Sequence, residues 1–400
     1  IIINVDIMGD AKMRILRIEA EGIFLFEGKA VIDFNAEQRV YPDNAAMLYN
    51  PFGNTYTNNV LSFVGVNASG KTTTLKLISF VMSLLNAEAI NTIDTKVILE
   101  KSTNVVLKTY FYDEKAGVCL LETVIGVTKE EGAVDRYTIL HERLYIRKAG
   151  SITSKANLFQ FANNDLYQSR DASEEQLLFL KDDVSIVIAL GKSGNVFFRD
   201  MTEWTDFNIL NSFGDFPTAL IQFLDPSIEY IKFNPNETEL IVKFKKYKEP
   251  ISMRGIQNIS HYLSSGTIKG LNVFMQAWMA LIKGGYFLVD EIENHFNKEI
   301  VATLIRFFMD EKVNKRGATL IYSTHYVELL DELDRNDGIY VTRNNDGISI
   351  QKLHHILKRN DIKKSDVFQS GMLEGTVPSY EASMRLKKTL ASGTIVEDNK

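Results

Sequence analysis

Residues 63–80 read FVGVNASGKTTTLKLISF, and this stretch decides the fold. Gly65, Gly70, Lys71 and Thr72 fit the pattern G-x-x-x-x-G-K-[ST], in which x is any residue. A short apolar run, Val60–Val64, comes directly before the pattern, and apolar residues at helical spacing follow it. The stretch therefore predicts a strand, a glycine-rich loop and a helix, in that order.

A loop of this composition is suited to hold phosphate. Glycines let backbone N–H groups turn inward around an anion, and the N-terminus of the following helix adds a partial positive charge. Lys71 would reach the terminal phosphates, and the Thr72 hydroxyl would bind magnesium. A glycine-rich turn that merely precedes a helix is the alternative. We expect ATP and Mg²⁺ as ligands, and the loop residues that would contact the nucleotide are Gly65, Asn67, Ala68, Ser69, Gly70, Lys71, Thr72 and Thr73.

Two acidic residues end a second apolar strand in YFLVDEIENHF, residues 286–296. An aspartate at this position of a phosphate-loop protein holds the magnesium shell, so Asp290 is expected to bind the metal with Thr72. Glu291 is placed to polarise the attacking water, as the catalytic partner of Lys71. A strand that simply ends in acidic residues is common, but its pairing with the phosphate loop favours the functional interpretation.

A serine-rich segment, HYLSSGTIKGL at residues 261–271, precedes the helix that leads into the acidic strand. Ser264, Ser265 and Gly266 at a helix N-terminus would present hydroxyls and unpaired N–H groups to an anion, as a second phosphate site. An ordinary serine cap beside a glycine explains the same residues. About sixteen helical residues, roughly 24 Å, separate Ser265 from the acidic strand, which leaves open whose phosphate this segment serves.

A histidine follows a third apolar strand in TLIYSTHYVELL, residues 319–330. Strand ends on one edge of a doubly wound sheet converge on the ligand, so His325 would contact the terminal phosphate as a third catalytic residue. A histidine beside a strand is more often structural, but the position favours function here. His295 could lie at the same surface, whereas His354 and His355 fit a solvated basic segment.

Together and in this order, these motifs resemble the ABC-type ATPase heads of the SMC and RecF proteins. The resemblance is strongest to the overcoming-lysogenization-defect group and the related AAA-labelled ATPases of bacterial phage-defence operons. GVNASGKT is similar to the Walker A loop, LSSGT to the signature motif, FLVDE to Walker B, IENHF to the D-loop and STH to the switch histidine. The resemblance implies a homodimer that sandwiches two ATP molecules, and a separate effector chain, a nuclease or toxin, that the ATPase regulates.

Several departures from those families limit what the resemblance implies. No glutamine loop can be placed, LSSGT differs from the transporter form LSGGQ, and no long heptad pattern predicts a coiled coil. The 75 residues after His325 are too few for a Toprim nuclease domain. A repair or recombination ATPase that binds DNA directly is the alternative function, with basic clusters in LHHILKRNDIKK and MRLKKTL as its only support. A small-molecule kinase would leave the signature and histidine motifs without a role.

The bulk composition is that of a soluble globular protein of 400 residues, with 45% hydrophobic and 24% charged residues. No apolar run approaches the length of a membrane span, and a lone cysteine, Cys119, fits a reducing cytoplasm. The net charge of -6 gives no global field for nucleic acid, so DNA would need a local patch. We therefore expect a cytoplasmic protein with no membrane partner.

The predicted fold is an α/β P-loop NTPase of the ABC-ATPase head type, with a mixed central sheet, an added antiparallel β lobe and a helical insertion. Strands are expected in 13–34 and 97–146, a connecting loop in 41–59, helical segments with loops in 157–211, and strands alternating with helices in the last third. The expected division is an N-terminal ATPase lobe (1–150), a helical insertion with connecting strands (151–250), a C-terminal ATPase lobe (251–345) and a tail (346–400).

Overall fold

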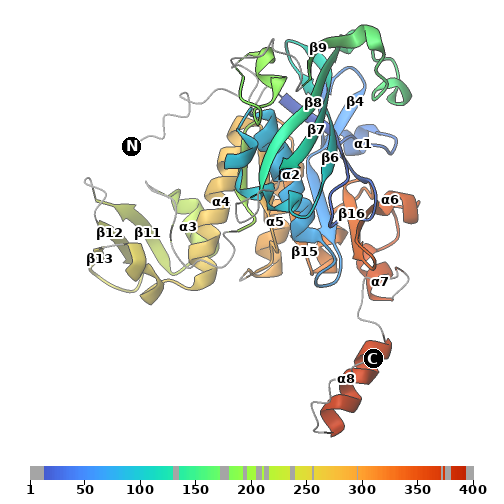
Figure 1. Ribbon diagram of the computed structural model, residues 1–400. Coiled ribbons are helices and arrows are strands. Elements are labelled where there is room, and N and C mark those ends of the chain that lie inside the picture. The colour runs from blue at the N-terminus through green and yellow to red at the C-terminus, as the bar shows by residue number, and fades with distance from the viewer. Residues whose placement is uncertain are drawn as a thin grey trace.

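The computed structural model describes residues 13–128, 135–171, 180–191, 196–203, 210, 216–234, 239–254, 256–294, 296–370, 373 and 380–392. Figure 1 shows one large body built on two sheets, with a small lobe beside it and a helix projecting from the C-terminal end.

A six-stranded mixed sheet forms the centre of the nucleotide core. In spatial order its strands are β10 (Phe198–Met201), β14 (Tyr286–Val289), β15 (Thr319–Thr324), β5 (Val60–Val64), β16 (Ile339–Asn344) and β17 (Ile348–Lys352). The first five are parallel to one another, and β17 runs antiparallel to β16. The predicted parallel arrangement of strands separated by helices is confirmed.

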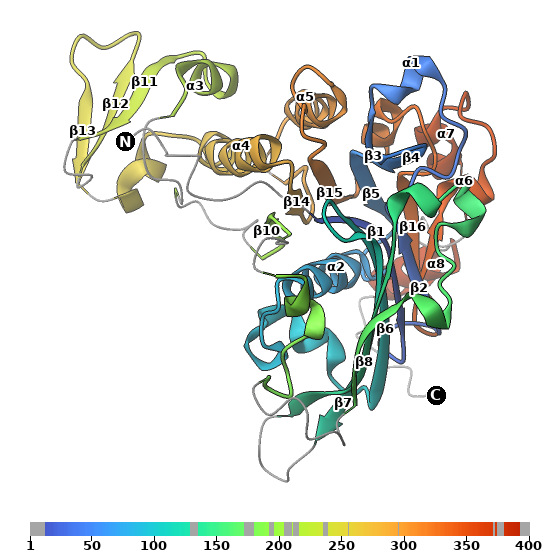
Figure 2. The same cartoon turned by 90° about the horizontal axis from the view of Figure 1, so that it is seen from above.

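Helices cover both faces of this sheet (Figure 2). The helix α2 (Lys71–Leu85) packs on one face with Leu61 and Phe63, and the helices α4 (Ser265–Lys283) and α5 (Lys298–Met309) pack on the other with Val60 and Val64. Successive strand residues point to opposite faces, so a strand buried on both must be apolar throughout. This burial explains the continuous apolar runs from which these strands were predicted.

The predicted antiparallel lobe is also confirmed. Its sheet has six strands in the order β2 (Ala30–Asp33), β1 (Met13–Glu21), β6 (Asn104–Asp113), β7 (Gly117–Thr128), β8 (Arg136–Arg147) and β9 (Leu166–Asp171). Apolar side chains of this sheet share one buried core with α2. The lobe therefore supports, from behind, the helix that follows the phosphate loop.

A second, smaller lobe packs on the N-terminal half of α4. It contains α3 (Thr218–Leu224) and an antiparallel sheet of β11 (Ile228–Phe233), β12 (Glu239–Phe244) and β13 (Ile251–Arg254). Leu263, Ile268 and Leu271 join its core, which is separate from the core between α4 and the central sheet. Figure 2 shows this lobe at the end of α4 away from the central sheet.

Two segments differ from the prediction. The expected loop over 41–59 contains a helical turn, α1 (Pro42–Ala45), and a hairpin of β3 (Leu48–Phe52) and β4 (Thr55–Asn58). The turn residues Gly53 and Asn54 suggested a loop, but they only separate two strands, and Thr55, Tyr56 and Thr57 favour a strand.

The helical content expected in 157–211 is the second difference. Its described residues contain short 3₁₀ turns such as Ile186–Leu190 and the strands β9 and β10, without an α-helix. Ile186 and Val187 are buried, but Gly191 has a positive φ of 87° and ends the 3₁₀ turn after five residues. The segment SEEQLLFLKDD, residues 173–183, belongs to the expected helical part, and most of it lies outside the described residues.

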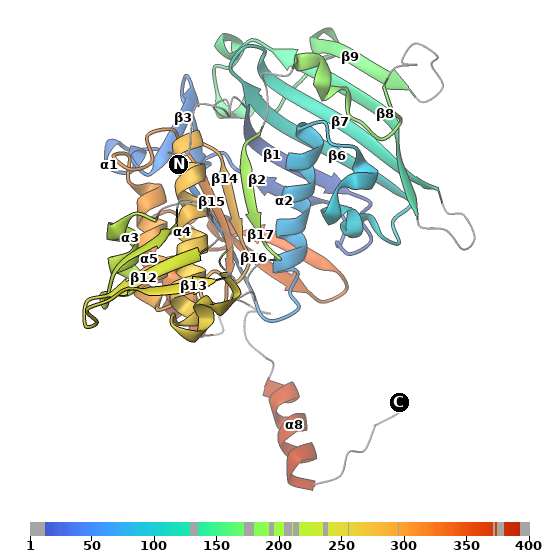
Figure 3. The same cartoon turned by 90° about the vertical axis from the view of Figure 1, so that its left-hand side faces the viewer.

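The C-terminal segment begins inside the core, because β17 is a strand of the central sheet. It continues as α6 (Leu353–Ile356) and α7 (Lys364–Gln369), and the Ser365 hydroxyl of α7 donates a 2.6 Å hydrogen bond to Asp331. The last helix, α8 (Tyr380–Ser392), stands away from the body (Figures 1 and 3).

Candidate functional site

The predicted site residues follow three neighbouring strands. In the central sheet β15 lies between β14 and β5, and all three are parallel. The phosphate loop follows β5, Asp290 and Glu291 follow β14, and His325 follows β15. Parallel strands end on the same edge of a sheet, so this topology brings the three segments together.

The phosphate loop has a backbone that depends on its glycines. Gly70 has a φ of +96°, and a Cβ there would lie 2.5 Å from the Ile348 side chain. At Gly65 a Cβ would lie 2.5 Å from the carbonyl oxygen of Thr342. The loop therefore turns tightly against β16 and β17, with no room for larger residues at either position.

Lys71 closes the loop in this structure. Its Nζ donates to the carbonyl oxygens of Gly65 (2.9 Å) and Val66 (3.1 Å), and the side chain is 6% exposed. Burial lowers the pKa of Lys71, against the opposing effect of nearby carboxylates, Asp290 first. A buried ammonium group held by the carbonyls of a glycine-rich loop is in position to meet an anion that enters the loop.

Thr72 and Asp290, the two predicted metal ligands, are in direct contact. The Thr72 Oγ1 donates a 2.5 Å hydrogen bond to Asp290 Oδ2, and Ser323 Oγ donates to the other carboxylate oxygen. A hydroxyl and a carboxylate oxygen side by side are the hard oxygen donors that Mg²⁺ prefers. The donor set therefore fits a magnesium ion bound through Thr72 and Asp290.

Glu291 is held in an unusual backbone conformation with a defined side-chain position. Its φ is +45°, uncommon for a residue with a side chain, and its N–H donates a 2.7 Å hydrogen bond to Ser323 Oγ. Asn294 Nδ2 donates to Glu291 Oε2 at 2.7 Å, and His325 Nε2 lies 3.4 Å from Oε1. The hydrogen bond from Asn294, and then His325, lowers the pKa of Glu291. An ionised carboxylate at the edge of the phosphate loop can accept a proton from water.

The histidine segment is fixed by a second carboxylate. The backbone N–H of His325 donates a 2.5 Å hydrogen bond to Oε1 of Glu293, which is 6% exposed. Glu293 lies two residues after Glu291, so the segments after β14 and β15 hold each other in register. This backbone contact places His325 opposite Glu291, and no local sequence pattern predicts it.

The other loop residues have mainly structural contacts. The Ser69 hydroxyl is buried and lies 2.8 Å from Thr342 Oγ1, and Asn344 Nδ2 donates to the Ala68 carbonyl at 3.0 Å. Asn67 and Ala68 are exposed at the tip, and Thr73 is half-buried in the first turn of α2. These contacts fix the loop to the central sheet and leave its backbone N–H groups as the groups able to meet a phosphate.

Ser264, Ser265 and Gly266 lie at the N-terminal tip of α4, with the small lobe. The Ser264 Oγ accepts a 3.1 Å hydrogen bond from Thr267 N–H, the geometry of an ordinary helix cap. Among the described residues, Ser264, Ser265 and Gly266 take no part in the hydrogen bonds that join the phosphate loop to Asp290, Glu291 and His325. The partly exposed first turn of α4 still offers N–H groups that no helical carbonyl can pair.

Sequence reasoning missed several supporting residues. Ser323 bridges Asp290 and Glu291, and Asn294 and Glu293 position the catalytic candidates. All three lie inside the quoted motifs STH and IENHF, but the sequence assigned them no role. The structure also shows that β10 lies beside β14, with Met201 level with Val289. Thr202 and Glu203, which follow β10, therefore lie at the same edge of the sheet as Asp290 and Glu291, which follow β14. The sequence had assigned no segment to this place beside the phosphate loop, and it had left the glutamine loop unplaced. Glu203 pairs with Lys76 of α2 at 3.1 Å.

Two predicted histidines fall elsewhere. His295 lies outside the described residues. His355 pairs with Glu37 at 2.9 Å, beyond the end of β17 that is away from the phosphate loop.

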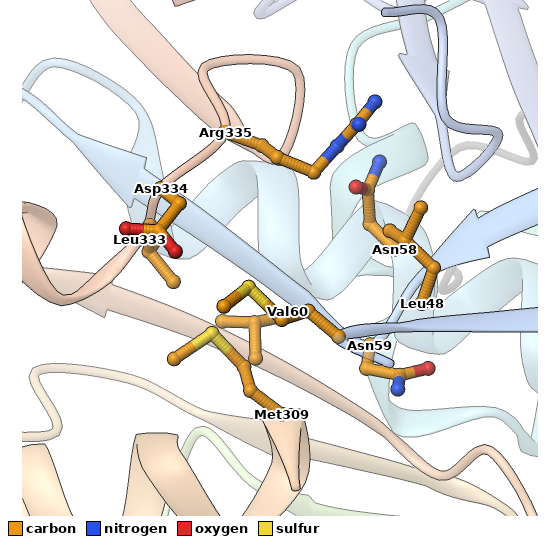
Figure 4. Close-up of a pocket in the computed structure, with 10 residues that line it drawn as sticks. Leu48, Asn58, Asn59, Val60, Met309, Leu333, Asp334 and Arg335 are labelled. Carbon is orange, nitrogen blue, oxygen red and sulfur yellow. The ribbon is translucent and has the colours of Figure 1, made fainter. Parts of the chain in front are cut away.

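The small cavity of Figure 4, about 20 Å³, is lined by Asn59 and Arg335 among others and lies at the amino ends of the parallel strands. It has room for one water molecule, which could bond the otherwise unpaired Asn59 Oδ1.

The sheet, the loop and the strand-end residues together define an α/β P-loop NTPase fold. The chain belongs to the family described as "AAA domain, putative AbiEii toxin, Type IV TA system", which matches residues 126–331, just over half of its length. The matched range contains Ser264, Asp290, Glu291 and His325 and begins after the phosphate loop.

The chain is also similar to a solved structure, the SMC head domain from Thermotoga maritima. The identity is 13%, the match covers 85% of this chain and 98% of that chain, and the TM-score is 0.39. No curated protein matches the chain. Within the part of the chain that the structure describes, no helix combines the length and the apolar character needed to cross a membrane.

Proposed function

We propose that the protein is an ABC-type ATPase that binds ATP with Mg²⁺, hydrolyses it to ADP and phosphate, and dimerises around it. The 2.5 Å contact between Thr72 and Asp290, with Glu291 as the next residue, carries this proposal. This contact supports the proposal, because a hydroxyl and a carboxylate suited to bind Mg²⁺ lie next to the Glu291 carboxylate at the mouth of the phosphate loop. A protein that only binds nucleotide has no need of that carboxylate.

Each residue of the site has its own part in this reaction. Lys71 leaves the carbonyls of Gly65 and Val66 to contact the terminal phosphates. Thr72 and Asp290 would hold Mg²⁺, which would neutralise phosphate charge when bound. Glu291 orients a water molecule and takes its proton, and the hydrogen bond from Asn294, which lowers the pKa of Glu291, favours the ionised carboxylate that this role requires. His325 donates a hydrogen bond to the γ-phosphate.

The serine-rich helix tip supplies the second half of each site. Ser264, Ser265 and Gly266 of one chain close over the phosphate held by Lys71 of another chain, so that two copies enclose two ATP molecules. The partly exposed first turn of α4 supports this role, because its N–H groups are open to an anion. Hydrolysis then opens the contact that the two chains make around ATP.

The biological role that we propose is regulation of a separate effector, a nuclease or toxin, in bacterial phage defence. The family's description refers to a toxin of a type IV toxin–antitoxin system, which supports a place in such a system. The basic segment LHHILKRNDIKK (residues 353–364) gives little support to direct DNA binding, because several of its basic side chains pair with carboxylates. These pairs are His355 with Glu37, Arg359 with Asp361, and Lys363 with Asp366.

A DNA repair or recombination ATPase remains the second candidate, for one reason. Arg385, Lys387 and Lys388 of α8 are exposed and form a basic cluster at the C-terminal end. Binding to DNA that requires ATP and weakens steeply with salt would favour this second role. Co-purification with an effector encoded beside the gene would favour the first.

Glu291→Gln tests the proposed ATPase. The variant should bind ATP, lose turnover by about 100-fold or more, and accumulate as a dimer when ATP is added, because water is no longer activated. Lys71→Ala is the control: it should lose ATP affinity in calorimetry and stay unable to form that dimer. Unchanged ATP hydrolysis by Glu291→Gln would refute the assignment of Glu291.

A further inference from the structure

The last helix, α8, exposes apolar side chains to solvent. Tyr380 is 78% exposed, Leu386 60% and Leu390 73%. Every described side chain of α8 is exposed except Met384, which is half-buried. Leu386 and Leu390, four residues apart, lie on one face, and Lys388 and Glu381 lie on the opposite face. The helix is therefore amphipathic, with its apolar face unused.

A helix of this length depends on a partner surface. Isolated helices shorter than roughly 12–15 residues are marginal in water, and α8 has 13 residues. Figures 1 and 3 show it standing away from the body of the protein. Its apolar face then has to be buried against another surface for the helix to be stable.

A groove elsewhere on the molecule has the matching character. It lies between α3, α4 and α5, has a volume of about 500 Å³ and is lined almost wholly by apolar side chains. Four of these are large and substantially exposed: Phe223 (42%), Trp278 (43%), Phe307 (39%) and Val313 (42%). An exposed aromatic groove between helices is the kind of surface that receives one amphipathic helix.

We propose that α8 of one copy docks in the groove between α3, α4 and α5 of a second copy. The contact is reciprocal: each chain gives its helix and receives that of its partner, so the assembly closes at two copies. This interaction surface goes beyond the proposed ATPase cycle, because it holds two chains together without nucleotide. It would raise the effective concentration at which two heads meet around ATP.

The path of the chain favours the second copy over docking within one chain. The segment 374–379 joins the buried Leu373 to α8, so the start of α8 lies at most about 25 Å from Leu373. Figures 1 and 2 show α5 between the groove helix α4 and α7, which precedes this segment. A helix docked within its own chain has to pass around α5, whereas one that points outward meets another molecule directly.

The oligomeric state of the nucleotide-free, full-length protein tests the proposal. Sedimentation velocity should show a dimer for the wild-type chain. Leu386→Glu/Leu390→Glu on the helix and Trp278→Glu in the groove should each weaken dimerisation by about tenfold or more, because a charge enters an apolar contact. Lys388→Glu places the same charge on the opposite face of α8 and should leave the dimer intact.

Mixing the two variants distinguishes a lost contact between chains from misfolding of either variant. The helix variant keeps an intact groove and the groove variant keeps an intact helix, so an equimolar mixture should form a heterodimer through one contact. A variant that had merely misfolded gives no such rescue. A monomeric wild-type protein overturns the proposal, whether its α8 docks in its own groove or binds a different protein. A mixture of the two variants that fails to associate overturns it as well.

These measurements contain no ATP, so they are independent of the ATPase proposal. If the nucleotide-free dimer is absent but Glu291→Gln still dimerises with ATP, only the helix exchange is wrong. If the dimer forms through α8 but ATP is not hydrolysed, only the ATPase proposal is wrong.

Discussion

The Ser323 hydroxyl accepts a 2.7 Å hydrogen bond from the backbone N–H of Glu291 and also donates to the carboxylate of Asp290. One side chain thus fixes both the proposed metal ligand and the strained backbone of the proposed base. Ser323→Ala should lower ATP turnover by about tenfold, the effect of roughly 1–1.5 kcal/mol of lost positioning. Steady-state kinetics at saturating Mg²⁺ measures it.

Ser365→Ala is the matched control for that variant. Ser365 is also buried and bonds a carboxylate, that of Asp331, but it lies on α7. We expect it to lower stability by about 1 kcal/mol while turnover stays at the wild-type value. Equal turnover in Ser323→Ala and Ser365→Ala contradicts the positioning role of Ser323.

Asn294→Ala should change the pH dependence of ATP hydrolysis. The hydrogen bond from Asn294 is the largest cause of the lowered pKa of Glu291, so its removal raises that pKa. Glu291 acts as a base only when ionised, so the acid limb of the kcat profile should move to higher pH. Asn344→Ala, which removes the bond to the Ala68 carbonyl, should weaken ATP binding a few-fold without moving the limb. A coincident acid limb in wild type and Asn294→Ala would contradict this.

Gly70→Ala should be more damaging than Gly53→Ala. Both positions have positive φ. A Cβ added at Gly70 would lie 2.5 Å from the Ile348 side chain, whereas a Cβ added at Gly53 would have no neighbouring atom within 4 Å. We expect a loss of about 1 kcal/mol at Gly53, from backbone strain alone, and about 3 kcal/mol or more at Gly70, with loss of ATP binding. Denaturant unfolding and calorimetry measure both effects.

The double variant Gly70→Ala/Ile348→Ala separates strain from overlap. Removing most of the Ile348 side chain should recover part of the stability lost in Gly70→Ala, while the cost of the positive φ remains. Recovery to the level of Ile348→Ala alone means that backbone conformation at Gly70 is unimportant.

Glu37 should make stability depend on acid pH. Burial alone raises the pKa of Glu37, but Lys352 and His355 outweigh it and hold the pKa at about 2, below the ordinary 4.5. A depressed carboxylate pKa contributes stability above pH 4.5 that is lost as the pH falls through about 2. Glu37→Gln should therefore cost about 1–2 kcal/mol near neutral pH, after allowance for solvent screening, and progressively less between pH 5 and 2. A difference that stays constant over this range contradicts the pairing.

The nucleotide core was predictable because its signals are local. The apolar run Val60–Val64, the glycine loop and the spacing of α2 lie next to one another in sequence, and the structure has β5 at those residues and α2 from Lys71 to Leu85. Asp290 and His325 were proposed in the same way, from acidic or imidazole side chains that follow apolar strands. Each of these inferences needed only a dozen neighbouring residues.

What the sequence did not reveal depends on partners distant along the chain. The strand β10 is beside β14 through pairing across more than eighty residues, and Glu293 bonds His325 across thirty-two. The hairpin of β3 and β4 was missed because Asn50 and Pro51, residues typical of turns, lie within β3 itself, next to the turn residues Gly53 and Asn54. In 157–211, apolar residues pack in short 3₁₀ turns, whose length is set by the surrounding core rather than by their own periodicity.

The helix α4 belongs to two cores at once, that of the central sheet and that of the small lobe. Its 19 continuous residues make a stiff rod about 28 Å long, with Ser264 at one end and the strand that carries Asp290 after the other. A pivot of only about 10° at the sheet end would swing the far tip by about 5 Å. A small rotation at the sheet end of α4 would therefore move the whole small lobe, because Leu263, Ile268 and Leu271 belong to the core of that lobe.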